Sequence, residues 1–135
     1  MHTVLIVDHE PESRRAIAGT LEEDGDYTVL TASTAQEAQR VLQQLRPDVT
    51  ILDMEESGDG GMDLACKIKT NHRLQSTRVI VISALSPADL PHARELSVRC
   101  APQKLIDVYF AKPYSPGCVA HQVGREVAKL PPTDG

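Results

Sequence analysis

Five short apolar runs recur along the chain, separated by segments with helical spacing or by loops. The runs cover residues 4–7, 27–30, 49–52, 79–82 and 108–111. They are rich in Val, Ile and Leu, a composition typical of strands buried on both faces of a parallel sheet. We therefore predict five strands.

The clearest helix lies between the second and third runs. Thr34 and Glu37 have the spacing of a capping box, in which each side chain accepts a hydrogen bond from an exposed backbone N–H group of the first turn. Apolar residues then follow at helical spacing and predict one buried stripe, formed by Ala38, Val41, Leu42 and Leu45. Further helices are predicted from about residue 11 to Gly25, around residues 64–68 and around residues 119–127, with weaker helical pieces between residues 87 and 105.

Alternation of strands and helices predicts the fold class. A repeated strand–helix order favours an α/β fold, a doubly wound five-stranded parallel sheet with helices on both faces. The length of 135 residues suits one domain. We expect this domain to cover residues 1–130, and residues 131–135 to be a tail or the start of a linker.

Charge is divided unevenly between the two halves of the chain. Residues 1–64 carry 14 acidic and 4 basic side chains, a net of −10, whereas residues 65–135 carry 5 acidic and 10 basic ones, a net of +5. The basic residues form no run of five or six, and Trp is absent, so we expect no direct nucleic-acid binding. Early acids and late bases are instead candidates for one shared site.

Cysteine and hydropathy patterns bear on the compartment. The three cysteines lie far apart without a C-x-x-C pair, which argues against a disulfide framework or a structural zinc site. The first apolar run stops at Asp8, and no later run reaches the length of a membrane span. We therefore expect a cytoplasmic chain with no membrane partner.

Polar residues follow four of the predicted strands. Asp8, Asp53, Ser83 and Lys112 each stand at or just after the end of a run, and the carboxyl ends of parallel strands form the ligand-binding edge of such sheets. Two carboxylates there can hold a hard cation such as Mg²⁺. A hydroxyl and an ammonium group can bind phosphoryl oxygens, so the set suits phosphoryl chemistry.

Four motifs at these strand ends resemble those of the receiver domain of two-component response regulators, and the likeness covers nearly the whole chain. They are Val7-Asp8-His9-Glu10-Pro11, Ile51-Leu52-Asp53-Met54, Val81-Ile82-Ser83-Ala84 and Lys112-Pro113. The resemblance implies a flavodoxin-like (βα)5 fold with the strand order 2-1-3-4-5 of chemotaxis regulators. It also implies a signalling domain, with at most self-catalysed phosphoryl transfer and autodephosphorylation, rather than an enzyme.

The same resemblance implies a role for each residue at the strand ends. Asp53 would accept a phosphoryl group from the phosphohistidine of a sensor histidine kinase or phosphotransfer protein. Ser83 would bind a phosphoryl oxygen, and Lys112 would bridge the acceptor carboxylate and the phosphoryl group. Tyr109, three residues before the lysine, falls at the aromatic switch position of the family, and the Lys112-Pro113 peptide bond is expected to be cis.

The metal site implied by the resemblance contains one departure from the family pattern. Asp8, Asp53 and the backbone carbonyl of Glu55 would hold Mg²⁺. The position of a further acidic ligand is occupied by His9, and imidazole is a poor partner for Mg²⁺. His9 is therefore interpreted as a weakened metal ligand, as a group that tunes the site near neutral pH, or as a transition-metal ligand, the least favoured of the three.

Two functions follow from these residues. The leading hypothesis is a receiver that is phosphorylated on Asp53 and then switches a face that binds a downstream output domain or protein. The alternative is a degenerate receiver that binds partners without phosphorylation, which the presence of His9 favours. A stand-alone enzyme is disfavoured because neither a D-x-D motif after the first strand nor a P-loop pattern is present.

Overall fold

The computed structural model describes residues 1–54, 59–84 and 106–130. The helical pieces predicted between residues 87 and 105, Glu55 and the tail at 131–135 lie outside the described residues. Within the described ranges, no helix combines the length and the apolar character needed to span a membrane.

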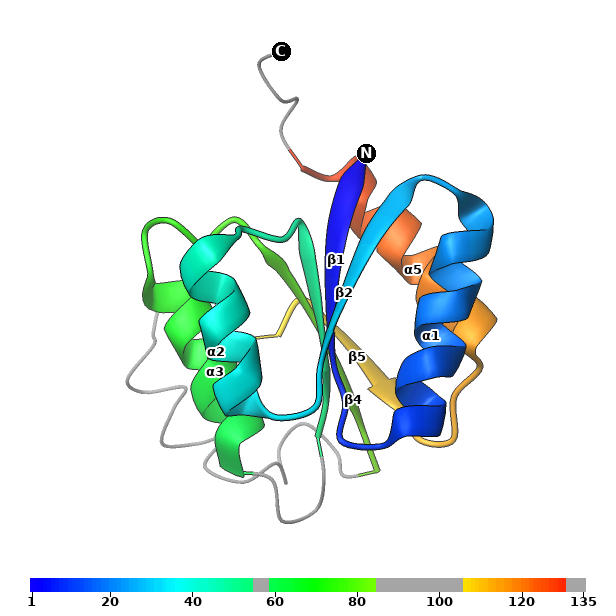
Figure 1. Cartoon of the computed structure of the whole chain (residues 1–135), viewed down its shortest axis with the longest axis horizontal. Coiled ribbons are helices and arrows are strands. Elements are labelled where there is room, and N and C mark those ends of the chain that lie inside the picture. The colour runs from blue at the N-terminus through cyan, green and yellow to red at the C-terminus, as the bar shows by residue number, and fades with distance from the viewer. Residues whose placement is uncertain (55–58, 85–105, 131–135) are drawn as a thin grey trace.

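A five-stranded parallel sheet forms the centre of the molecule. Its strands are paired in the order β2-β1-β3-β4-β5 (Figure 1), which confirms the predicted topology. The strands are β1 (His2–Val7), β2 (Tyr27–Ala32), β3 (Val49–Asp53), β4 (Arg78–Ser83) and β5 (Val108–Ala111). β5 is the shortest and lies at one edge, paired with β4 alone.

Helices cover both faces of the sheet. Figure 1 shows two of them side by side on each face: α1 (Pro11–Asp24) with α5 (Pro116–Ala128), and α2 (Ala35–Gln44) with α3 (Asp59–Thr70). Side chains alternate between the faces along each strand. Leu5 and Val7 of β1 therefore pack toward α2 and α3, whereas Val4 and Ile6 pack toward α1 and α5. The doubly wound architecture predicted from the apolar runs is confirmed.

The ends of α1 and α2 follow from local chemistry. α1 ends at Asp24 and is capped by Gly25, which adopts the left-handed conformation with φ +75°, a backbone state that glycine occupies at little cost. α2 begins after Thr34, whose hydroxyl accepts the Glu37 N–H group as predicted. The Glu37 carboxylate, however, accepts from the N–H and hydroxyl groups of Ser33 rather than from the backbone of Thr34.

Leu45 departs from the predicted apolar stripe of α2. Ala38 and Leu42 are buried, but Leu45 is 45% exposed. The helix ends at Gln44, and Leu45 is extended, with φ −133° and ψ 155°. The chain has therefore already turned toward β3 where helical spacing would continue the stripe, consistent with Pro47 two residues later.

Cysteine pairing differs from the expectation. Cys66 is buried on α3 and is disulfide-bonded, whereas Cys118 is a free, exposed thiol on α5. Spacing along the sequence does not report which cysteines meet in the fold, so the absence of a C-x-x-C pair did not exclude a bridge at Cys66.

Candidate functional site: the carboxyl edge of the sheet

The four polar residues predicted for the site lie at the carboxyl edge of the sheet. Asp53 and Ser83 are the last residues of β3 and β4, while Asp8 and Lys112 directly follow β1 and β5. Asp8 and Ser83 are almost fully buried. These groups share one edge because all five strands run in the same direction.

Asp53 and Lys112 form an ion pair. The Nζ atom of Lys112 lies 2.6 Å from Oδ1 of Asp53, and the side chain of Asp53 is only 2% exposed. The side chain of Lys112 is 30% exposed, so the ion pair joins a partly exposed base to a buried acid. The contact is an ion pair between opposite charges, at a position where the carboxylate has little access to solvent.

Asp8 is held by its own turn and by α1. Its Oδ1 atom accepts the N–H group of Glu10 at 2.9 Å, and its backbone carbonyl accepts a hydrogen bond from the guanidinium of Arg14 at 2.8 Å. Burial raises the pKa of Asp8 to about 6; the Glu10 N–H group opposes this shift, and the neighbouring carboxyl group of Asp53 adds to it. The two acids therefore lie close together in a poorly solvated position.

The acid pair fits a divalent cation of the magnesium type. Oδ2 of Asp8 is buried and has no hydrogen-bond donor among the described residues. A cation would compensate that oxygen and the repulsion between the acids. Within residues 1–54, 59–84 and 106–130 there is no group of three or more His, Cys, Asp or Glu side chains suited to a metal. Two carboxylates nevertheless suffice for Mg²⁺, which commonly retains several waters and binds phosphoryl oxygens.

His9 and Glu55 contribute differently from the acid pair. The side chain of His9 is exposed, whereas Asp8 next to it is buried. The imidazole of His9 is therefore not buried together with the acid pair. Glu55, whose backbone carbonyl was predicted to bind the metal, lies outside the described residues.

Tyr109 and Lys112 both contact the end of β4. The Tyr109 hydroxyl donates to the backbone carbonyl of Ser83 at 3.2 Å, and the Lys112 N–H group donates to the same carbonyl at 3.0 Å. The tyrosine ring is half-buried against the α2–α3 side of the core. The Lys112-Pro113 bond is cis, as expected from the family resemblance.

A hollow of about 600 Å³ opens beside Lys112. Its lining comes from the start of α1 and from the connection between β5 and α5: Glu12, Ser13, Ala16, Lys112, Pro113, Tyr114 and Pro116. Burial raises the pKa of the Tyr114 hydroxyl, and the charges of Asp8 and Asp53 raise it further. A hydrogen bond with Ser13 lowers this pKa but does not cancel the increase. Tyr114, Ser13 and Arg14 were not predicted as site residues, because none belongs to a motif at a strand end.

The chain is similar in sequence to known response regulators. The family described as the response regulator receiver domain matches residues 4–117. The phosphate regulon transcriptional regulatory protein PhoB of Pseudomonas aeruginosa is 33% identical over 114 residues, which are 84% of this chain and 46% of that protein. A protein-glutamate methylesterase/protein-glutamine glutaminase of Agrobacterium fabrum is 37% identical over 84 residues, 62% of this chain and 23% of that protein. The chain thus spans less than half the length of either relative.

The fold is also similar to a solved receiver. The crystal structure of the signal receiver domain of a signal transduction histidine kinase from Syntrophus aciditrophicus superposes with a TM-score of 0.79 at 26% identity. The match covers 100% of this chain and 96% of that one. With the family match over residues 4–117, these likenesses show that the chain belongs to the response regulator receiver domain family of two-component systems.

Proposed function

We propose that this domain accepts a phosphoryl group on Asp53 from the phosphohistidine of a sensor histidine kinase or phosphotransfer protein. The observation that carries the proposal is the buried Asp53 carboxylate paired with Lys112 at 2.6 Å, beside a second buried acid, Asp8. Clustered, electrostatically coupled groups at a ligand-binding edge are typical of a reactive site rather than of a solvated surface.

The chemistry assigns one step to Asp53. A carboxylate oxygen attacks the phosphorus atom, the bond from phosphorus to the donor imidazole nitrogen breaks, and an acyl phosphate forms as the imidazole leaves with the electron pair. Lys112 already contacts the acceptor carboxylate, so its ammonium can neutralise charge on the transferring group. Such neutralisation and positioning supply most of the catalysis in phosphoryl transfer.

Ser83 and the acid pair complete the proposed site. Ser83 would bind a phosphoryl oxygen from its position at the end of β4. Asp8 and Asp53 would hold Mg²⁺, which when bound neutralises phosphoryl oxygens. The hollow beside Lys112 leaves room for a donor side chain to approach from the side of α1.

The proposed response to phosphorylation passes through the end of β4. Tyr109 is tied to the Ser83 backbone, so recruitment of Ser83 by a phosphoryl group would alter the position of the ring. Tyr109 lies on β5 at the edge of the sheet, next to a surface that a downstream output domain or protein could contact. We place this signalling in the cytoplasm, where a kinase would meet its receiver.

Covalent labelling tests the acceptor. The protein is incubated with acetyl phosphate and Mg²⁺, and intact mass is measured before and after base treatment. Wild type is expected to gain one acid-stable, base-labile phosphoryl group, and Asp53→Asn to gain none. Asp63→Asn, which changes an exposed acid on α3, is the matched control and should label as wild type does. Failure of wild type to label, when an ordinary receiver labels in parallel, would favour the degenerate receiver.

A metal titration separates the interpretations of His9. His9→Asp places a hard oxygen ligand beside the acid pair, so we expect it to bind Mg²⁺ more tightly than wild type does, as measured by calorimetry without any phosphoryl donor. His72→Asp, a change at an exposed histidine on the connection after α3, should leave the affinity unchanged. Equal affinities for wild type and His9→Asp would show that His9 does not weaken the site.

A further inference from the structure

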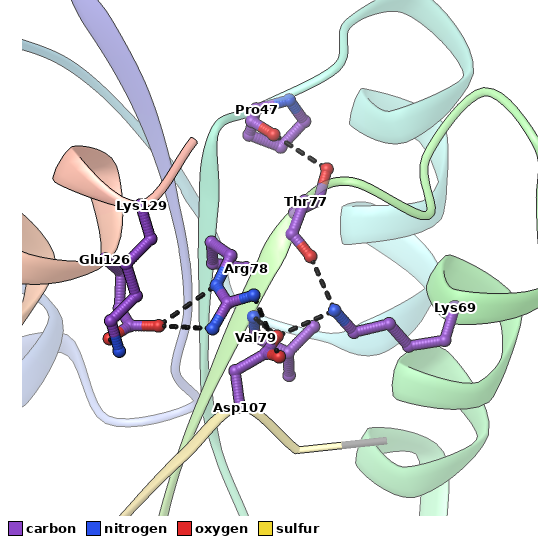
Figure 2. Close-up of polar contacts among 8 residues, drawn as sticks. All are labelled: Pro47, Lys69, Thr77, Arg78, Val79, Asp107, Glu126 and Lys129. Carbon is purple, nitrogen blue, oxygen red and sulfur yellow. Dashed lines mark hydrogen bonds and ion pairs between the residues drawn. The ribbon is translucent and has the colours of Figure 1, made fainter. Parts of the chain in front are cut away.

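A second polar cluster lies at the opposite edge of the sheet, where β4 and β5 begin. Figure 2 shows it running from α3 to α5 through residues at the two strand starts. The cluster consists of Lys69, Thr77, Arg78, Asp107, Glu126 and Lys129. It takes no part in the site proposed above, yet three of its charged side chains are nearly inaccessible: those of Lys69, Asp107 and Glu126 are 8%, 6% and 0% exposed.

Asp107 is the centre of this cluster. Its Oδ2 atom accepts from the ammonium group of Lys69 at 2.7 Å and from the backbone N–H group of Val79 at 2.7 Å. Its Oδ1 atom is 3.4 Å from the guanidinium of Arg78. The donors belong to α3 and to the start of β4, so every one of them lies outside β5, the strand that Asp107 precedes.

Arg78 connects the cluster to α5. Its Nε and Nη2 atoms donate to Oε1 of Glu126 at 3.0 and 2.9 Å, and Gln122 and Lys129 donate to Oε2. Burial raises the pKa of Glu126, but these hydrogen bonds outweigh it and hold the pKa below its ordinary value. Glu126 therefore binds one side of the Arg78 guanidinium, whereas Asp107, which directly precedes β5, lies near its other side.

Contacts at the start of β5 matter for its register because the strand forms few backbone hydrogen bonds of its own. It has four residues and one neighbouring strand. A shift by one residue moves a strand by about 3.3 Å and exchanges its two faces. Such a shift would take Lys112 away from Asp53 and would exchange the positions of Tyr109 and Phe110, which now pack on opposite sides of the sheet.

We propose that Asp107 is a positioning residue that fixes the register of β5 and thereby places Lys112 against Asp53. A one-residue shift would pull the buried carboxylate away from donors that α3 and β4 hold in place, leaving charges unpaired at low solvent access, which is strongly unfavourable. Asp107 thus fixes the register at the start of the strand, and this register determines the position of Lys112 at the end of the strand. The role of Lys112 in phosphoryl transfer rests on the proposed function; the positioning of β5 does not.

Hydrogen exchange on the whole, unphosphorylated protein tests the positioning directly. Asp107→Asn keeps the shape of the side chain but removes its charge. We expect exchange at residues 108–112 to accelerate by about tenfold or more relative to residues 4–7 of β1, the effect of losing one charge-assisted hydrogen bond. Glu126→Gln is the matched control: it weakens the same cluster at α5, so it should destabilise the protein while leaving the ratio between β5 and β1 unchanged.

Labelling with acetyl phosphate provides the second readout. Asp107→Asn is expected to label about tenfold more slowly than wild type, and Glu126→Gln at the wild-type rate. If wild type does not label, the proposed function fails, while the exchange ratio still decides the positioning of β5. A folded Asp107→Asn with an unchanged ratio would overturn the proposal, as would an equal change in Glu126→Gln. Should the single variant not fold, Lys69→Gln combined with Asp107→Asn removes both buried charges and is measured against the same criteria.

Discussion

Asp8 is a buried acid whose ionised form the fold disfavours. Its pKa is raised from 3.8 to about 6, mainly by burial and also by the carboxyl group of Asp53. The folded protein therefore binds a proton more readily than the unfolded chain does. The resulting cost to stability is fully present above about pH 6, decreases as the pH falls toward 3.8, and is absent where both states are protonated.

Asp8→Asn should consequently stabilise the metal-free protein at pH 7, by up to about 3 kcal/mol. An asparagine oxygen can still accept the Glu10 N–H group that Asp8 now binds, so the turn is expected to persist. Urea unfolding at pH 7 and at pH 4 measures the effect, which should shrink at the lower pH. Glu23→Gln, at an exposed position near the end of α1, should show little change at either pH. A destabilised Asp8→Asn at pH 7 would contradict the assignment of strain to this acid.

Most of the site could be predicted at the residue level because its residues occupy strand ends. Asp8, Asp53 and Lys112 were placed together correctly since the carboxyl ends of parallel strands share one edge. Arg14 could not be predicted in the same way. Its contact with the Asp8 carbonyl depends on where a helical side chain points once α1 has packed, and no sequence spacing encodes that direction.

Gly19 in α1 and Gly25 directly after it differ in their surroundings and backbone conformation. Gly19 lies inside the helix, and a methyl group built there meets no atom within 4 Å. Gly25 lies just beyond the helix in the left-handed conformation, with φ +75°. A side chain is therefore favourable at the first position, where it restricts the unfolded chain, and strained at the second.

We expect Gly19→Ala to raise the free energy of unfolding by about 0.5–1 kcal/mol and Gly25→Ala to lower it by about 1–2 kcal/mol. Each variant serves as the control for the other, since both add one methyl group near solvent. Thermal or urea unfolding distinguishes them. Effects of the same sign would show that the end of α1 is not set by the backbone conformation of Gly25.

At the level of elements, apolar periodicity predicted the strands and helices of the described residues well, because burial on one or two faces imposes a period that sequence preserves. The ends of elements were harder to predict. The stripe in α2 was extended to Leu45, but the approach to β3 ends the helix one residue earlier. Periodicity describes which face is buried and contains no information on where the chain must turn.

Arg78 connects α5 to the start of β5, and Asp107 extends this connection to Lys69 of α3 on the other face of the sheet. Its guanidinium pairs with Asp107 at the start of β5 and with the fully buried Glu126 of α5 (Figure 2). Arg78→Gln would leave two buried carboxylates without this partner, so a loss of about 3 kcal/mol in stability is expected. Lys129→Gln removes a mostly exposed partner of Glu126 and should cost less than about 1 kcal/mol. Equal losses in urea unfolding would show that the bridge between layers contributes little.

The uneven charge of the two halves is partly explained by the whole fold. Lys112 from the basic half pairs with Asp53 from the acidic half, as the sequence suggested. Lys69 and Arg78, however, both pair with Asp107, and all three residues come from the basic half. That cluster could not be predicted, because net charge over a segment does not report which charges the fold buries together.

Cys118 is a suitable attachment site for a fluorescent dye. The chain has no Trp, so intrinsic fluorescence offers little signal from the carboxyl edge of the sheet. Cys118 is a free, exposed thiol in the first turn of α5, two residues after Pro116, which lines the hollow beside Lys112. A maleimide dye attached there without reducing agent would leave the bonded Cys66 untouched. Under the proposed function, its emission is expected to change when Mg²⁺ or a phosphoryl donor binds at the site, which can be followed in real time.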